Sequence, residues 1–167
     1  PILGFTEHTV HNETGTGKIP LDVKGADLDS DGDIDIVVAY QFANVTWFEN
    51  NGSPNLEDWK ERTINKWDFD RGEQETRDTQ SVVTKDMDGD RDIDVVTASS
   101  GSNLVFWFVN NGTPQLAEPE GNEAWTTKAI DDGTPGGPIT VFAADLDKDD
   151  DLDVIRRVSG VDVAASI

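Results

Sequence analysis

Short runs of apolar residues recur along the chain, and no window keeps the spacing of an amphipathic helix. The runs are rich in β-branched or aromatic residues and are bounded by turn residues such as Asn51-Gly52 and Asn111-Gly112. They are residues 21–26, 34–38, 45–50 and 59–64, then 80–85, 93–96, 104–110 and 125–130, and finally 139–144, 152–155 and 161–167. Runs of this length and composition predict short β-strands.

The runs form a unit that is repeated along the chain. An acidic segment follows the first run of each unit, and the first aspartates of these segments, Asp27, Asp86 and Asp145, are separated by 59 residues in both cases. A fixed interval of this kind indicates a repeat architecture rather than a solvated charge run. Each unit therefore predicts four antiparallel strands, with the acidic segment joining the first strand to the second.

Four-stranded units of about 40–50 residues are typical of β-propeller blades. The sequence predicts an all-β fold in which residues 1–167 form one region of three four-stranded antiparallel blades, a partial propeller. The blades are expected at residues 19–64, 80–130 and 138–167, the last without its fourth strand, while residues 5–10 form the fourth strand of a neighbouring blade. The alternative is a β-sandwich whose hairpins are similar by coincidence.

Three blades are too few to close a ring, because propellers usually have four to eight. The partial propeller is therefore completed either by further blades of a longer chain or by another copy. In the second case, strand 5–10 of one copy completes the third blade of the next by adding to its open edge. A closed rotation gives a dimeric ring and an open one gives a filament. Association is favoured over a lone monomer, without a preference between the ring and the filament.

Composition and charge exclude several classes of function. The chain has 34 acidic and 13 basic residues and a net charge of −21, which repels nucleic acid and anionic membrane surfaces. No apolar run is long enough to insert in a membrane as a helix. The absence of cysteine excludes disulfides, zinc–thiolate sites and thiol catalysis.

The acidic segments have the chemistry of calcium loops, because calcium takes six to eight oxygen ligands and acids at alternate positions can surround it. Counted from the first aspartate, positions 1, 3, 5 and 9 are carboxylates in all three loops, and position 7 is expected to offer its backbone oxygen. The predicted metal residues are Asp27, Asp29, Asp31, Asp33 and Asp35; Asp86, Asp88, Asp90, Asp92 and Asp94; and Asp145, Asp147, Asp149, Asp151 and Asp153. Up to three Ca²⁺ ions are expected, one in each loop; the alternative is that the acids are only polar turn residues.

The pattern is not that of an EF-hand, which has a glutamate at position 12 and flanking helices. D-x-D-x-D-G-x-x-D followed at once by a β-branched strand instead resembles the FG-GAP repeat family, also called VCBS repeats, and the calcium-loop blades of integrin α-subunits. The resemblance implies a calcium-stabilised β-propeller of an extracellular protein. Position 6 favours glycine because a positive φ is expected there. Since it is Gly32, Arg91 and Asp150 in turn, the first loop is expected to bind calcium best and the second worst.

These observations favour an extracellular, secreted or cell-surface module with a structural or adhesive role. The alternatives are a lectin-like propeller that binds glycans through Trp67 or Tyr40, or an accessory domain of a secreted polysaccharide-active enzyme. No catalytic residue is predicted, since His8 and His11 belong to no catalytic motif. The other four tryptophans recur in register and are expected to pack between blades: Trp47, Trp59, Trp107 and Trp125.

Overall fold

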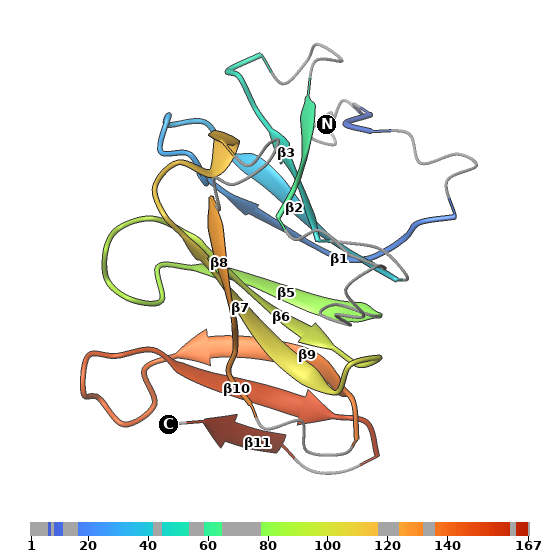
Figure 1. Cartoon of the computed structure of the whole chain (residues 1–167), viewed down its shortest axis with the longest axis vertical. Helices are drawn as coiled ribbons and strands as arrows, with labels where there is room; N and C mark the ends of the chain where they lie inside the picture. The colour runs from blue at the N-terminus through green and yellow to red at the C-terminus, as the bar shows by residue number, and fades with distance from the viewer. Residues whose placement is uncertain are drawn as a thin grey trace, which may run out of the picture.

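Three antiparallel β-sheets make up the described part of this chain in a computed structural model (Figure 1). The structure describes residues 7, 9–11, 17–41, 45–53, 59–64, 78–116, 124–131, 136–160 and 163–166. In sheet 1 the strands are β1 (Ile19–Ala26), β2 (Asp35–Gln41), β3 (Thr46–Glu49) and β4 (Lys60–Thr63). Sheet 2 contains β5 (Thr79–Lys85), β6 (Asp94–Ser99), β7 (Leu104–Asn110) and β8 (Trp125–Ala129). Sheet 3 contains β9 (Pro138–Ala144), β10 (Asp153–Val158) and β11 (Val163–Ser166).

Each strand is hydrogen-bonded to the next one along the chain, so that each sheet is a simple meander. This confirms the prediction of an all-β protein built from antiparallel four-stranded sheets. Three separate sheets also differ from the two-sheet arrangement of a β-sandwich. Within the described residues the only helical segment is a 3₁₀ turn, η1 (Pro114–Leu116).

The described strands do not close into a ring, and the number of blades in a complete assembly stays a prediction. The strand expected at residues 5–10 falls mainly outside the described residues; Glu7, Thr9 and Val10 are described and are not in a strand. Among the described residues, no helix is long and apolar enough to cross a membrane.

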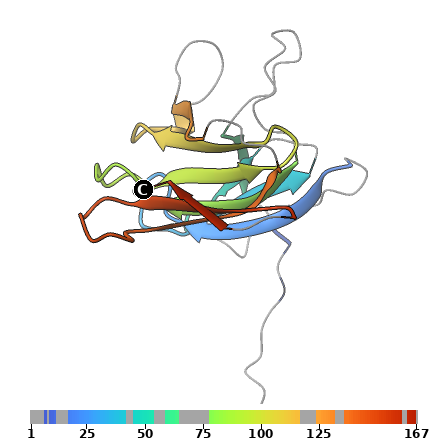
Figure 2. The same cartoon turned by 90° about the horizontal axis from the view of Figure 1, so that it is seen from below.

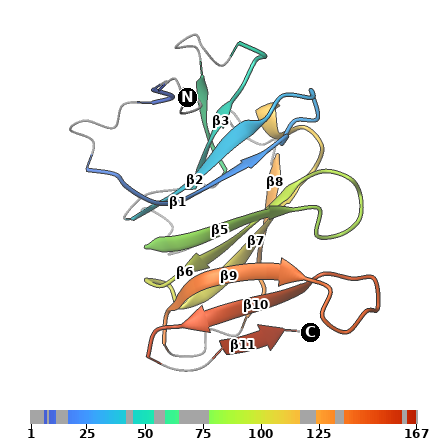
Figure 3. The same ribbon diagram turned by 180° about the vertical axis from the view of Figure 1, so that it is seen from behind.

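The three sheets are stacked face to face, with sheet 2 between the other two. Their first strands, β1, β5 and β9, lie side by side along one edge of the stack (Figure 3). The loops that follow these strands, β1–β2, β5–β6 and β9–β10, all project from the same end of the stack (Figure 1). The three sequence repeats therefore place their acidic loops in a row at one end of the stack.

Two apolar layers hold the stack together. Between sheets 1 and 2, Leu28, Val37 and Trp47 pack against Val82 and Phe108. Between sheets 2 and 3, Val96, Ala98 and Val105 pack against Val141 and Val154, with Met87 and Trp107 at the border of this cluster. Trp125 lies in the first layer, so Trp47, Trp107 and Trp125 pack between sheets as predicted. Trp59 instead lies against the outer face of sheet 1, on a cluster formed by residues of that sheet.

A polar contact also joins the first strands of sheets 1 and 2. Asp22 Oδ2 accepts hydrogen bonds from the Ser81 hydroxyl at 3.1 Å and from the Val82 backbone N–H at 3.0 Å. Burial acts to raise the pKa of Asp22, but these bonds and the ammonium group of Lys24 hold it below its usual value. Asp22 is therefore a charged residue that links sheets 1 and 2 through hydrogen bonds. The sequence alone did not identify it.

Candidate metal centres

The acidic loops bring carboxylate oxygens from different positions close together. In the first and third loops the acids at positions 1, 3 and 9 converge, whereas in the second loop it is positions 1, 3 and 5. Within each group, ligand atoms lie within 4.8 Å of one another. The groups are Asp27, Asp29 and Asp35; Asp86, Asp88 and Asp90; and Asp145, Asp147 and Asp153. Two oxygens on opposite sides of a calcium ion are about 4.8 Å apart, so this spacing suits one divalent cation.

The acid at position 9 is the first residue of the second strand, and backbone hydrogen bonds hold it in place. Asp35 accepts bonds from the backbone N–H of Leu28 at 3.0 Å and of Asn50 at 2.8 Å. Asp94 makes the same two bonds, to Met87 and Asn110. These carboxylates therefore fix the ends of the loop in addition to any role as ligands.

Burial shifts the titration of these two acids. It raises the pKa of Asp35 to about 6, against the partial compensation of the two backbone N–H groups. The pKa of Asp94 is raised for the same reason. A nearby positive charge, such as a divalent ion, would stabilise the ionised form of these carboxylates.

The acids at positions 1 and 5 shape the loop from inside. Asp27 accepts bonds from the backbone N–H groups of Asp31 and Gly32, both at 3.1 Å. Asp31 in turn accepts a bond from Asp33 N–H at 2.8 Å. In the second and third loops, Asp90 and Asp149 accept a bond from position 7 in the same way, whereas Asp86 and Asp145 accept bonds from the N–H groups at positions 4 and 6. Part of the aspartate pattern is therefore explained by loop folding alone.

Position 7 was expected to contribute a backbone oxygen, and its side chain is not part of the converging groups. Asp33 Oδ2 lies so near Gly52 that a Cβ on this glycine would be 2.9 Å from it. In the second loop, a Cβ on Gly112 would likewise be 2.7 Å from Asp92 Oδ2. Both glycines also have positive φ, so the Asn-Asn-Gly turn after the third strand excludes side chains for two reasons.

The backbone is left-handed at two positions of every acidic loop. At position 6, φ is 96° for Gly32, 84° for Arg91 and 74° for Asp150, as expected from the sequence. Position 4 is also left-handed, with Ser30, Gly89 and Lys148 at φ of 60°, 78° and 67°. The positive φ at position 4 was not predicted from the sequence, although the glycine at this position of the second loop, Gly89, indicates it.

One carboxylate oxygen of the first loop has the surroundings of a candidate metal ligand. Asp29 Oδ1 is buried and has no hydrogen-bond partner in the described part of the structure. Burial raises the pKa of Asp29, a side-chain hydrogen bond with Gln115 partly opposes this, and the charge of Asp31 adds to the increase. A buried carboxylate oxygen without a partner costs folding free energy, which a bound divalent ion would remove. The donor set of this loop therefore fits calcium.

Two buried asparagines at the ends of β3 and β7 were missed at the sequence level. Asn50 donates from Nδ2 to the Ile34 carbonyl at 3.1 Å and accepts a bond from Gly52 N–H. Asn110 does the same with Ile93 and Gly112, and it also donates to Leu28 O of sheet 1 at 2.8 Å. Their signal was the repeated Asn-Asn-Gly after each aromatic strand.

Comparison with known families decides what kind of repeat this is. A family model described as FG-GAP-like repeat matches the chain twice, over residues 27–84 and 86–155, and each match begins at the first aspartate of an acidic loop. The chain belongs to the FG-GAP-like repeat family. The third acidic loop lies within the second match. A comparison with curated protein sequences finds no match. FG-GAP-like repeats are generally non-enzymatic modules.

Of the candidate glycan-binding residues, Trp67 lies outside the described residues. Tyr40 is only 2% exposed, so the hypothesis of an exposed sugar platform there is wrong. His8 also lies outside the described part, and His11 packs against Phe48 with ring centroids 5.1 Å apart.

Proposed function

We propose that this FG-GAP-like chain is an extracellular calcium-binding module with a structural or adhesive role. The observation that carries the proposal is the repeated convergence of three carboxylates, together with the buried, unpartnered oxygen of Asp29. Calcium would be held by the aspartates at positions 1 and 3 of each loop, with position 9 in the first and third loops and position 5 in the second. It would supply positive charge, not a reaction.

The role of the ion follows from the electrostatics of the loops. Like charges at this spacing repel one another and raise each other's pKa. A divalent ion replaces that repulsion by attraction and fixes the rim of the stack, where the loops project side by side (Figure 1). Calcium sites of extracellular modules have dissociation constants of about 10⁻⁴–10⁻³ M, and sites of this affinity would be filled at extracellular calcium levels.

Calorimetric titration with calcium tests the proposal, with magnesium as the control ion. We expect up to three ions per chain and much weaker binding of magnesium, which dehydrates reluctantly. With each site at about ten times its dissociation constant, calcium adds about 1.4 kcal/mol per site. Removing it with a chelator should lower Tm by about 5–15 °C for a chain of this size. An unchanged Tm and no heat of binding would exclude a calcium role.

A further inference from the structure

The segment of sheet 2 that follows β7 lies against the first acidic loop, which belongs to sheet 1. This segment ends in the 3₁₀ turn η1, which lies beside the β1–β2 loop in two views (Figures 1 and 3). It contacts two consecutive residues of that loop. Asn110 donates from Nδ2 to the Leu28 carbonyl at 2.8 Å, and the Gln115 side chain is hydrogen-bonded to the Asp29 carboxylate. Two side chains of a neighbouring sheet therefore hold the first loop.

The backbone of η1 is fixed to sheet 1 by Arg62 of β4. Arg62 Nη1 donates to the Gln115 carbonyl at 2.5 Å, and Arg62 Nε donates to Glu49 Oε2 at 2.6 Å. The Arg62 side chain is only 15% exposed, so both bonds are largely shielded from water. Charge-assisted hydrogen bonds of this kind are stronger than those between neutral groups. Arg62 therefore keeps Gln115 within reach of the loop.

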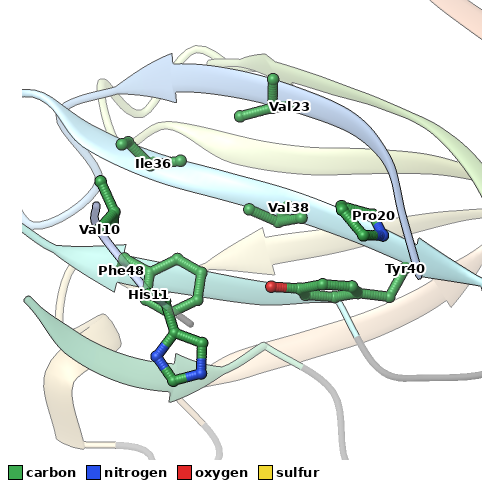
Figure 4. Close-up of a pocket in the computed structure, with 8 residues that line it drawn as sticks. All are labelled: Val10, His11, Pro20, Val23, Ile36, Val38, Tyr40 and Phe48. Carbon is green, nitrogen blue, oxygen red and sulfur yellow. The ribbon is translucent and has the colours of Figure 1, made fainter. Parts of the chain in front are cut away.

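Arg62 makes these contacts on the inner face of sheet 1, which is turned to sheet 2. It lies directly opposite Trp47 in the β3–β4 pair, and its guanidinium carbon is 5.6 Å from the centre of the Trp47 ring. Phe48, the next residue of β3, points to the outer face, where it lines an apolar cavity with Ile36 and Val38 (Figure 4). The Arg62 contacts therefore belong to the interface between sheets 1 and 2 and are separate from this cavity.

Asp29 is the loop residue on which these contacts act. It converges with Asp27 and Asp35, and its Oδ1 is buried without a hydrogen-bond partner in the described part of the chain. The bond with Gln115 holds the carboxylate group and leaves Oδ1 available to an ion. Hydrogen-bond partners of this kind orient metal ligands, and their loss typically lowers metal affinity by about 10–100-fold.

A neutral amide is well suited to this position. Glutamine can donate a hydrogen bond to Asp29 without cancelling its negative charge, whereas a lysine or arginine in its place would compete with a bound cation. The positive charge of Arg62 is paired with Glu49 at 2.6 Å. The Asp29 carboxylate therefore stays attractive to a divalent ion.

The third loop provides an internal comparison. Its acid at position 3, Asp147, is the equivalent of Asp29, and the β9–β10 loop extends beyond the strands of sheet 3 when the molecule is seen from below (Figure 2). The hydrogen bonds that the described residues give to Asp147 come from Asp149 of the same loop. The same aspartate pattern thus occurs with a partner from another sheet in the first loop and with a partner from its own loop in the third.

From these contacts we propose that Gln115 is a positioning residue for the metal ligand Asp29, so that the calcium affinity of the first loop is set in part by sheet 2. The inference rests on the proposed calcium function and adds to it a residue outside the aspartate pattern. Because coupling between two contacts is reciprocal, calcium in the first loop should in turn strengthen the bond between Asp29 and Gln115. Calcium then stabilises the contact between sheets 1 and 2 as well as the loop.

Gln115→Met tests the inference, because methionine has nearly the length of glutamine but has no donor for Asp29. It is made in a chain in which Asp88→Asn and Asp147→Asn weaken the second and third sites, so that calorimetric titration reports mainly the first loop. We expect the dissociation constant for calcium to rise about tenfold, which corresponds to about 1.4 kcal/mol of binding free energy. Gln41→Met, at the far end of β2 from the loop, is the matched control and should leave this constant unchanged.

Thermal unfolding of the same variants separates positioning from a purely structural role. If Gln115 orients Asp29, Gln115→Met should reduce the rise in Tm that calcium gives, relative to Gln41→Met. A residue that only holds the sheets together would lower Tm equally in calcium and in chelator. An unchanged dissociation constant, or an equal loss of Tm in both conditions, would overturn the inference.

A background that lacks the Asp29 side chain provides a second measurement. In Asp29→Ala, the carboxylate that Gln115 orients is gone, so Gln115→Met should change the remaining calcium affinity by less than about twofold. A tenfold effect that persists in this background would show that Gln115 acts by another route, and it would overturn the positioning role.

The same titrations distinguish failure of this inference from failure of the proposed function. Calcium binding that is equally strong with and without Gln115→Met contradicts only the positioning role. Absence of calcium binding by the unsubstituted 167-residue chain contradicts the calcium function and the inference that rests on it.

Discussion

The first and third acidic loops have almost the same aspartates but very different surroundings. In the first loop, Leu28 is 1% exposed, lies between two sheets and has its carbonyl bonded to Asn110 of sheet 2. In the third loop, the equivalent Leu146 is 46% exposed, and no described sheet lies beyond it. The aspartate pattern therefore defines the loop, whereas the neighbouring sheet determines how deeply the loop is buried and whether it is hydrogen-bonded to another sheet.

The largest expected difference is in stability. Leu28→Ala removes a fully buried side chain from the layer between sheets 1 and 2 and should lower the free energy of unfolding by about 2–4 kcal/mol. Leu146→Ala removes a half-exposed side chain and should cost less than about 1 kcal/mol. Urea unfolding at low protein concentration measures both. Equal effects would show that the first loop gains nothing from its neighbour.

Next comes the effect of one carboxylate on calcium binding and on stability. In chelator, Asp29→Asn should raise the free energy of unfolding by about 1 kcal/mol, because it removes a half-buried charge that the neighbouring carboxylates repel and whose Oδ1 has no hydrogen-bond partner. In calcium, the same change should reverse sign, because it removes a ligand. Asp147→Asn, in the exposed third loop, should change stability in chelator by less than about 0.5 kcal/mol. A destabilised Asp29→Asn protein in chelator would contradict the prediction.

The metal-free protein should also respond to pH through the first loop. Asp35 has a folded-state pKa of about 6, raised above the ordinary value of 3.8, so between these values the folded state binds more protons than the unfolded state. This contribution to stability is complete below about pH 4 and is lost as pH rises through about 6. Asp35→Asn should flatten this part of the curve of unfolding free energy against pH in chelator. An unchanged slope would assign it to other groups.

The smallest effect concerns backbone strain. Arg91→Gly should stabilise the metal-free protein by about 0.5–1 kcal/mol, because arginine at φ of 84° pays a steric cost that glycine avoids. Gly32→Ala should have the opposite sign and a similar size in the first loop. Thermal unfolding of the two variants with the wild type gives the comparison. If neither variant shifts Tm, strain at position 6 does not distinguish the loops.

Much of this architecture follows from the sequence because it depends on local, repeated signals. The strand positions follow from apolar runs, and the positive φ at position 6 follows from Gly32. Other features required the structure because they join residues far apart in the chain. The bond from Asn110 to Leu28 spans 82 residues, and no local pattern encodes it. The backbone bonds of Asp35 were hidden for a related reason, since a carboxylate at a ligand position gives no sign that it also anchors a strand.

The uneven distribution of glycine over the left-handed positions has a consequence for how such loops are recognised. The first loop has its glycine at position 6, the second has it at position 4, and the third has none, although all three share one backbone path. A consensus motif that insists on glycine at one fixed place would identify a single loop of this chain. Searches that score the spacing of the aspartates, and accept glycine at either position 4 or position 6 or at neither, would find related modules that a stricter motif overlooks.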